Sequence, residues 1–164
     1  MRLHNGIMRR FAIESFEPGL VGTSSPPWLN LPQVAEVAVT SEDPQGPVEL
    51  AFLGEAPGWR AGGTGDQTVR LLFDPPQRIS RIFLRFVETE TERTQEFSLR
   101  WSAERRGLSR EIVRQQWNFS PSGATTEVED YRVALDGVTV LELAINPDLN
   151  RRAVRATLAE WRIA

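Results

Sequence analysis

Two segments of the sequence combine aromatic, guanidinium and amide side chains in a way that is typical of carbohydrate sites. Trp59 is followed directly by Arg60 and a glycine-rich stretch, and Trp117 is followed by Asn118 and a turn-rich stretch. An indole face stacks on the C–H-rich face of a sugar, while guanidinium and amide groups form directed hydrogen bonds to hydroxyls or carboxylates. These four residues are the candidate ligand-binding residues. For each indole, the alternative is that it packs into the core beneath its loop.

The residues needed for acid–base catalysis are scarce. The chain has no cysteine, and His4 is its one histidine. Common nucleophilic triads, thiolate sites and histidine-rich metal sites therefore lack their residues. Glu88, Glu90 and Glu92 could pair as glycosidase carboxylates do, but their alternation with threonines predicts a solvated tip between strands. We therefore expect a protein that is not an enzyme; a small hydrolase would need a carboxylate pair facing one pocket.

The composition predicts one globular domain with a packed core. Of 164 residues, 40% are hydrophobic and 25% charged, which is ordinary for such a domain. The net charge of −3 gives no reason to expect nucleic acid as a partner. No apolar run approaches the roughly 20 residues of a membrane span. The first ten residues lack a signal peptide's apolar stretch, so the chain as written is expected in the cytoplasm, or outside the cell if a leader was removed.

Short stretches of alternating apolar and polar residues predict strands throughout the chain, with Pro75-Pro76 ending one of them. No segment carries a helical stripe, and at most one helical turn is expected, over 149–155. We assign a single domain over 1–164, in which 1–33 is an N-terminal strand and loop extension and 34–164 is a β-sandwich. The expected strands cover residues 9–16, 34–40, 67–74, 79–86, 97–101, 110–117, 128–135, 138–145 and 157–163.

Several of these pieces, in this order, resemble the discoidin family, also called the coagulation-factor type C domain, of the galactose-binding-like superfamily. They are the segments 40–42, 58–60, 67–77, 79–86, 97–103 and 158–163. The resemblance implies an all-β fold, an antiparallel eight-stranded jelly-roll sandwich with ligand-binding loops at one end. Many members bind glycans, whereas others bind phospholipid head groups or proteins.

The resemblance also raises a possible calcium site. Family members often hold calcium with loop carbonyls and acidic side chains, including a glutamate of the closing strand, which Glu160 matches. The family's loop aspartate is replaced here by Leu53. Because calcium needs about six to eight oxygen ligands, this loss argues against the site, and no other cofactor is expected.

Two functions remain open from the sequence. The first is non-catalytic carbohydrate binding through loops at one end of the sandwich. The alternative is an intracellular protein-interaction or assembly domain of the same fold. The sequence leaves the ligand and the oligomeric state undecided.

Overall fold

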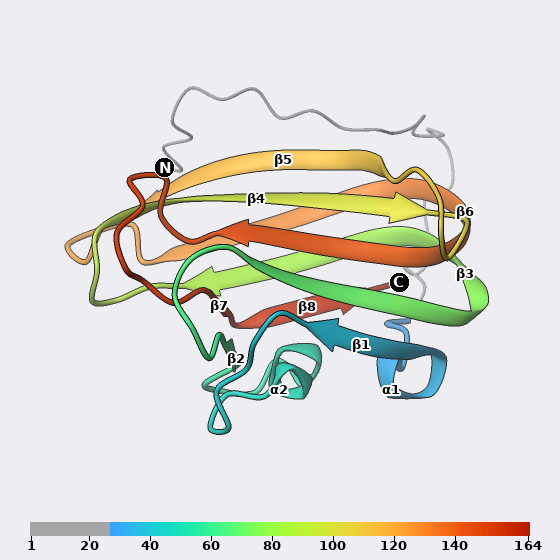
Figure 1. The fold of residues 1–164 in the computed structure, drawn as a ribbon, viewed down its shortest axis with the longest axis horizontal. Coiled ribbons are helices and arrows are strands. Elements are labelled where there is room, and N and C mark those ends of the chain that lie inside the picture. Colours follow the sequence, from blue (N-terminus) through green and yellow to red (C-terminus); the bar gives the residue numbers. More distant parts are fainter. Residues whose placement is uncertain (1–26) are drawn as a thin grey trace.

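A computed structural model describes residues 27–164. The strand expected over 9–16, and most of the N-terminal extension, lie outside the described residues. The described chain is mostly antiparallel β-sheet arranged in two packed layers (Figure 1). The expected jelly-roll architecture is confirmed.

Two long strands, β3 (Gln67–Val87) and β6 (Thr126–Asn146), contribute to both layers. The first part of β3 pairs with the last part of β6, and the last part of β3 pairs with the first part of β6. Register shifts between Leu72 and Arg81 mark where β3 passes from one layer to the other. Pro75 and Pro76 cannot donate ladder hydrogen bonds, and they lie within this bend. The prediction that Pro75-Pro76 ends a strand is therefore wrong, because one strand bends there and continues.

The remaining strands complete the layers. One layer has the order β1 (Ala35–Val39), β3, β6, β4 (Arg93–Ser102) and β5 (Arg110–Phe119). In the other layer, β8 (Glu160–Ile163) pairs with the last part of β3. A separate short ribbon joins β2 (Trp59–Arg60) to β7 (Thr157–Leu158).

The core lies between the layers and is made by alternate residues of each strand. Leu71, Leu84 and Leu99, which come from both layers, are 1% exposed or less. Each buried leucine of this kind contributes about 1.5–3 kcal/mol. Since the chain has no cysteine, disulfides add nothing to this packing.

Of the two short helices, α1 (Leu31–Val34) contacts β1, and α2 (Val48–Leu53) contacts β8 and β2. The backbone N–H of Val48 donates to Oε1 of Glu42 at 2.6 Å, which satisfies one free donor of the first turn of α2. Gly54, at a φ of 66°, ends the helix in the left-handed region. The sequence did not predict α2 because six residues are too few for a helical stripe to emerge. The turn expected over 149–155 forms no helix.

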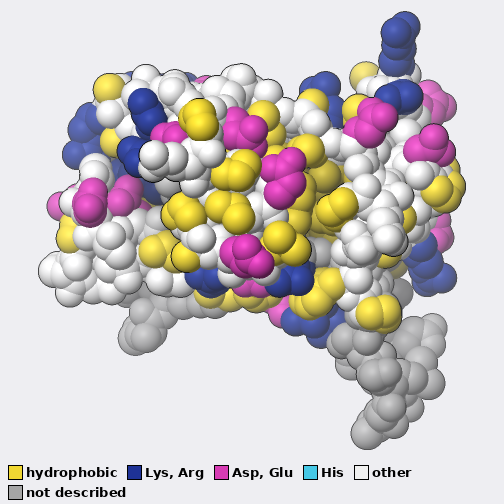
Figure 2. All heavy atoms as spheres, turned by 90° about the horizontal axis from the view of Figure 1, so that it is seen from below, with side chains coloured by type: hydrophobic (Ala, Val, Ile, Leu, Met, Phe, Trp, Pro, Cys, Tyr) yellow, Lys and Arg dark blue, Asp and Glu magenta, His cyan; other side chains and the backbone are white. Residues whose placement is uncertain are grey.

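Hydrophobic side chains gather on the side of the molecule where α1, α2 and β1 lie (Figure 2). Val37 and Val39 of β1 are half-buried there, and Leu53 at the end of α2 is 55% exposed. In the described part of the chain, no helix is long and apolar enough to cross a bilayer.

Candidate functional site

Four connecting segments meet at one end of the sandwich, at the left in Figure 1. They are residues 40–66, 88–92, 120–125 and 147–156. Connecting segments on a rigid sheet scaffold are common places for binding sites. We call this the loop end, and two clefts formed by residues 27–164 lie there.

The first, which we call the Arg60 cleft, has a volume of about 710 Å³. It lies between segments 40–66, 88–92 and 147–156, and it is lined largely by charged groups, hydroxyls and one amide. These polar side chains belong to Asp43, Gln45, Arg60, Thr64, Glu88, Thr89, Glu90, Thr91, Arg155 and Thr157.

Arg60 presents an exposed side chain from a backbone that is hydrogen-bonded through both its N–H and its carbonyl. Its N–H donates to the carbonyl of Gly46 at 3.0 Å, and its carbonyl accepts from the N–H of Asp43 at 2.9 Å. The Arg60 side chain is exposed and forms no ion pair with any residue in 27–164. In the same cleft, Nη1 of Arg155 lies 3.3 Å from Oδ2 of Asp43. The cleft therefore offers one unengaged guanidinium beside a paired cation and anion.

Trp59 lies in the core beneath this cleft. Its side chain is 0% exposed, and its Nε1 donates to the carbonyl of Ser41 at 3.3 Å. Because the indole has no face in contact with solvent, it cannot stack on a sugar in this structure. The stacking role expected for Trp59 is replaced by a packing role, in which it supports the segment that carries Arg60.

The second cleft, which we call the Asn118 cleft, has a volume of about 830 Å³. Asn118 is exposed, and its Oδ1 accepts from Oγ1 of Thr94 at 2.6 Å, which leaves its amide N–H groups available. The neighbouring Trp117 is only 4% exposed and lies in the core. The other polar side chains of this cleft belong to Glu92, Arg93, Ser120, Asn150 and Arg152.

The four sequence-predicted residues therefore do not form one site. Arg60 lines one cleft and Asn118 lines the other, while Trp59 and Trp117 pack inside the sandwich. Strand alternation explains why the indoles lie inside: Trp117 shares a face of β5 with the buried Val113 and Gln115.

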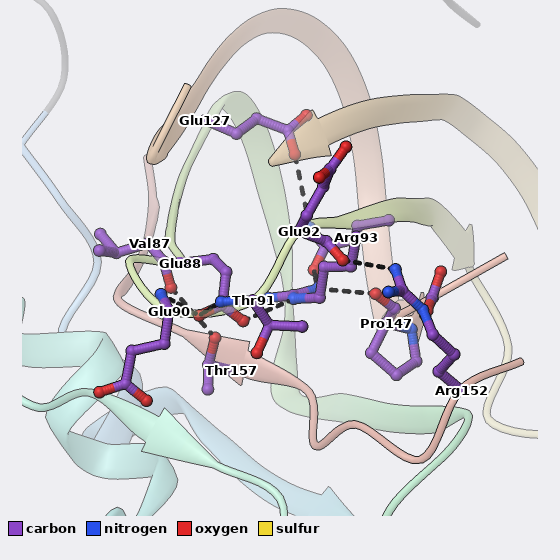
Figure 3. A network of polar contacts seen from close by, with 12 residues as sticks. Val87, Glu88, Glu90, Thr91, Glu92, Arg93, Glu127, Pro147, Arg152 and Thr157 are labelled. Carbon is purple, nitrogen blue, oxygen red and sulfur yellow. Dashed lines mark hydrogen bonds and ion pairs between the residues drawn. The ribbon is translucent and has the colours of Figure 1, made fainter. Parts of the chain in front are cut away.

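A buried arginine that the sequence interpretation missed connects two of the loop-end segments (Figure 3). Arg93 is 1% exposed, and its Nε donates to Oε1 of Glu88 at 2.8 Å. Its Nη1 donates to the carbonyl of Pro147 at 2.8 Å and to Oε1 of Gln95 at 3.1 Å. The guanidinium carbon also lies 4.7 Å from the ring centroid of Phe119. A signal was present, because Arg93 alternates with Gln95 and Phe97 on the inward face of β4.

Glu88 is therefore not part of the solvated tip that the sequence predicted. Its side chain is 19% exposed, and Oε2 accepts from the backbone N–H groups of Glu90 and Thr91 at 3.1 and 3.4 Å. Burial alone would raise the pKa of the Glu88 carboxyl, but the hydrogen bond from Arg93 and these two N–H groups lower it below its usual value. Glu88 is held as a carboxylate that orders its own segment.

A second arginine, Arg152, also ties these two segments together. Nε of Arg152 lies 2.6 Å from Oδ2 of Asp148, whose side chain is 0% exposed. Arg152 also donates from Nη2 to the carbonyl of Glu92. Burial opposes ionisation of Asp148, but hydrogen bonds from the Asn150 N–H and Arg152 outweigh it, so the pKa of Asp148 is lowered. Two arginines thus link segments 88–92 and 147–156. Arg93 binds Glu88 and the Pro147 carbonyl, and Arg152 binds the Glu92 carbonyl.

The surroundings of Glu160 do not fit calcium. Its Oε1 lies 3.4 Å from Nη2 of Arg85, and its Oε2 lies 3.3 Å from Nε of Arg162. Arg162 also donates from Nη2 to the carbonyl of Leu53 at 2.8 Å. A guanidinium therefore joins the last carbonyl of α2 to the carboxylate that the family resemblance assigned to calcium. Across residues 27–164, no group of three or more acidic or histidine side chains could hold a metal ion.

Comparisons with known proteins identify the fold. No family model matches the sequence, and no curated protein matches it. Among solved structures, the chain is similar to a module of a family 31 glycoside hydrolase from Clostridium perfringens, named CBM32-3. The TM-score is 0.61 at 13% identity, over 83% of this chain and 93% of that one.

Two further structures are similar to the chain. The family 32 carbohydrate-binding module of NanJ from Clostridium perfringens, solved with galactose, has a TM-score of 0.54 at 16% identity, over 79% of this chain and 92% of that one. The family 32 module of AlyQ, solved with 4,5-unsaturated mannuronic acid, has a TM-score of 0.53 at 17% identity, over 80% and 95%. Family 32 modules have the discoidin, or galactose-binding-like, fold, so the fold implied by the resemblance is confirmed.

Proposed function

We propose that this protein is a non-catalytic carbohydrate-binding domain and that the Arg60 cleft holds the sugar. The observation that carries the proposal is the unengaged Arg60 guanidinium in a polar cleft, at the end of a sandwich whose structural neighbours are carbohydrate-binding modules. The alternative of an intracellular protein-interaction domain stays a prediction.

The cleft supplies both kinds of hydrogen-bonding group that a sugar needs. Arg60 would donate paired hydrogen bonds to vicinal hydroxyls, and the exposed carboxylate of Glu90 would accept from others. The hydroxyls of Thr64 and Thr89 can act in either direction. Since no tryptophan lines this cleft, recognition would rest on directed hydrogen bonds, and weak affinity per site is expected.

The contacts of the carboxylates in the Arg60 cleft support the proposal that the domain is non-catalytic. Glu88 is committed to Arg93, and Asp43 lies beside Arg155. The pKa of Glu88 is lowered by its hydrogen bond from Arg93, whereas a general acid needs a raised pKa. Glu90 alone does not form the two-carboxylate arrangement of glycosidases.

The test is a glycan array followed by titration calorimetry of each hit, with wild type and Arg60→Ala. Loss of a hydrogen-bonding charged group predicts an affinity at least about tenfold lower. Arg78→Ala is the matched control, because Arg78 is 77% exposed and lies in the bend of β3, away from the loop end. Equal affinity for Arg60→Ala and wild type, or no binding of any glycan class at millimolar concentration, would contradict the proposal.

A further inference from the structure

The five tryptophans differ sharply in whether a ring face is available. Trp59, Trp117 and Trp161 are at most 4% exposed. Trp28 is 36% exposed, but the guanidinium of Arg81 lies 4.6 Å from its ring centroid. Both oxygens of Asp130 hold that guanidinium in place, at 2.9 and 2.8 Å. Trp28 is therefore already stacked, and Trp101 is the remaining indole.

Trp101 is half-buried at the end of β4, away from the loop end. With Leu108, Arg110 and the acidic Glu104 it lines a cleft of about 430 Å³ beneath the connection between β4 and β5. The guanidinium carbon of Arg110 lies 6.0 Å from the ring centroid, farther than in the stacked Trp28 pair. Among residues 27–164, no carboxylate pairs with Arg110. Unlike Arg81, it is free to move aside and engage a ligand.

The segment that covers this cleft, residues 103–109, is fixed at both ends. The hydroxyl of Thr139 donates to the carbonyl of Ala103 at 2.9 Å. At the other end, Arg100 donates from Nε and Nη2 to Oγ and the carbonyl of Ser109, at 2.8 and 3.0 Å. Despite this order, Leu108 is 97% exposed. An ordered segment thus presents an uncovered aliphatic side chain beside an indole.

We propose that the Trp101 cleft is a second saccharide site, specific for sugars that carry a carboxylate. The C–H face of a pyranose ring would lie on the Trp101 indole, with Leu108 against its edge. Arg110 would pair with the carboxylate through two parallel N–H donors, and Arg106 adds positive charge from the same segment. Arg106 and Arg110 favour an anionic ligand, because neither has an ion-pair partner in the described chain and Glu104 is the one carboxylate that lines the cleft.

This site is independent of the Arg60 cleft, and the experiment separates the two. Trigalacturonate and neutral galactotriose are titrated separately into wild type, Arg110→Ala, Leu108→Ala and Arg60→Ala. Affinity is measured by calorimetry and by tryptophan fluorescence. Arg110 and Leu108 are exposed, so their replacement leaves the core intact. Trp101→Phe is a further variant that keeps an aromatic face.

The expected result is that trigalacturonate changes the tryptophan fluorescence of wild type and of Arg60→Ala equally. Its affinity falls about tenfold in Arg110→Ala and less in Leu108→Ala, and galactotriose binds at least about tenfold more weakly to this site. The proposal is overturned if trigalacturonate does not bind at millimolar concentration. It is also overturned if the two trisaccharides bind Arg60→Ala with equal affinity or if Arg110→Ala retains wild-type affinity for trigalacturonate. These outcomes do not decide whether the Arg60 cleft binds sugar. Only the comparison of Arg60→Ala with wild type tests that function.

Discussion

Nε of Arg93 donates to Oε1 of Glu88 at 2.8 Å, and this buried pair joins the first residue of β4 to the segment that precedes it. The same guanidinium reaches the carbonyl of Pro147 from the next segment. An arginine with several fixed partners defines one geometry for them, since its donors are planar and rigid. Both segments line the Arg60 cleft. By fixing their positions, Arg93 therefore determines the shape of that cleft.

Replacing Arg93 with methionine keeps much of the side-chain volume but leaves Glu88 without its cation. Breaking a buried pair on one side costs about 3 kcal/mol or more, and we expect a loss of about that size in the free energy of unfolding, measured with urea. Arg70→Met is the control, because the Arg70–Glu142 pair is 49% and 24% exposed and such pairs contribute at most about 1 kcal/mol. Similar losses for both variants would show that Arg93 has no special role.

Acid should weaken the loop end. The pKa values of Glu88 and Asp148 are lowered in the folded protein. Their contribution to stability is therefore complete above the usual carboxyl values of about 4 and is lost as the pH falls through the folded values. We expect a melting temperature that depends on these two groups only below about pH 4. Glu88→Gln should flatten this acid dependence, whereas Glu49→Gln on the exposed side of α2 should leave it unchanged. A curve for Glu88→Gln that is parallel to wild type down to pH 2 would refute the assignment.

Calcium should not stabilise this protein. Arg162 already joins the Leu53 carbonyl to Glu160, so a cation at that place would be repelled. We expect the melting temperature to be the same in millimolar calcium and in EDTA. Arg162→Ala should lower the free energy of unfolding by about 1.5–3 kcal/mol, as for hydrogen bonds to a charged group. A rise of several degrees on adding calcium to wild type would contradict this interpretation.

Trp59 should behave as a core residue. Replacing a fully buried tryptophan by alanine costs about 3–5 kcal/mol, whereas Leu108→Ala, at 97% exposure, should stay within about 0.5 kcal/mol. Both values can be measured by denaturant unfolding. If Trp59→Ala were as stable as wild type, the indole would have to lie outside the core, and its stacking role would return.

Much of the fold could be predicted because the alternation of apolar and polar residues in a strand is visible over a few neighbouring residues of the sequence. Val69, Leu71 and Phe73 face inward as their spacing indicates. The long continuous strands were not predictable, because a run of Asp-Pro-Pro indicates a stop locally, whereas the two layers require a bend. The candidate site was harder to predict. Arg60 is exposed as expected, but the exposure of Trp59 depends on what packs above it, and no local pattern contains that information.

The central claim is that the loop end binds sugar in the Arg60 cleft. The most direct measurement is a 1H–15N NMR titration of the assigned protein with the best ligand from the glycan array. We expect the shifted amide resonances to cluster at Asp43, Arg60, Thr64 and residues 88–91, with a smaller response at the Arg78 bend. Shifts absent from these residues while the ligand binds elsewhere, or no shift at millimolar glycan, would contradict the claim.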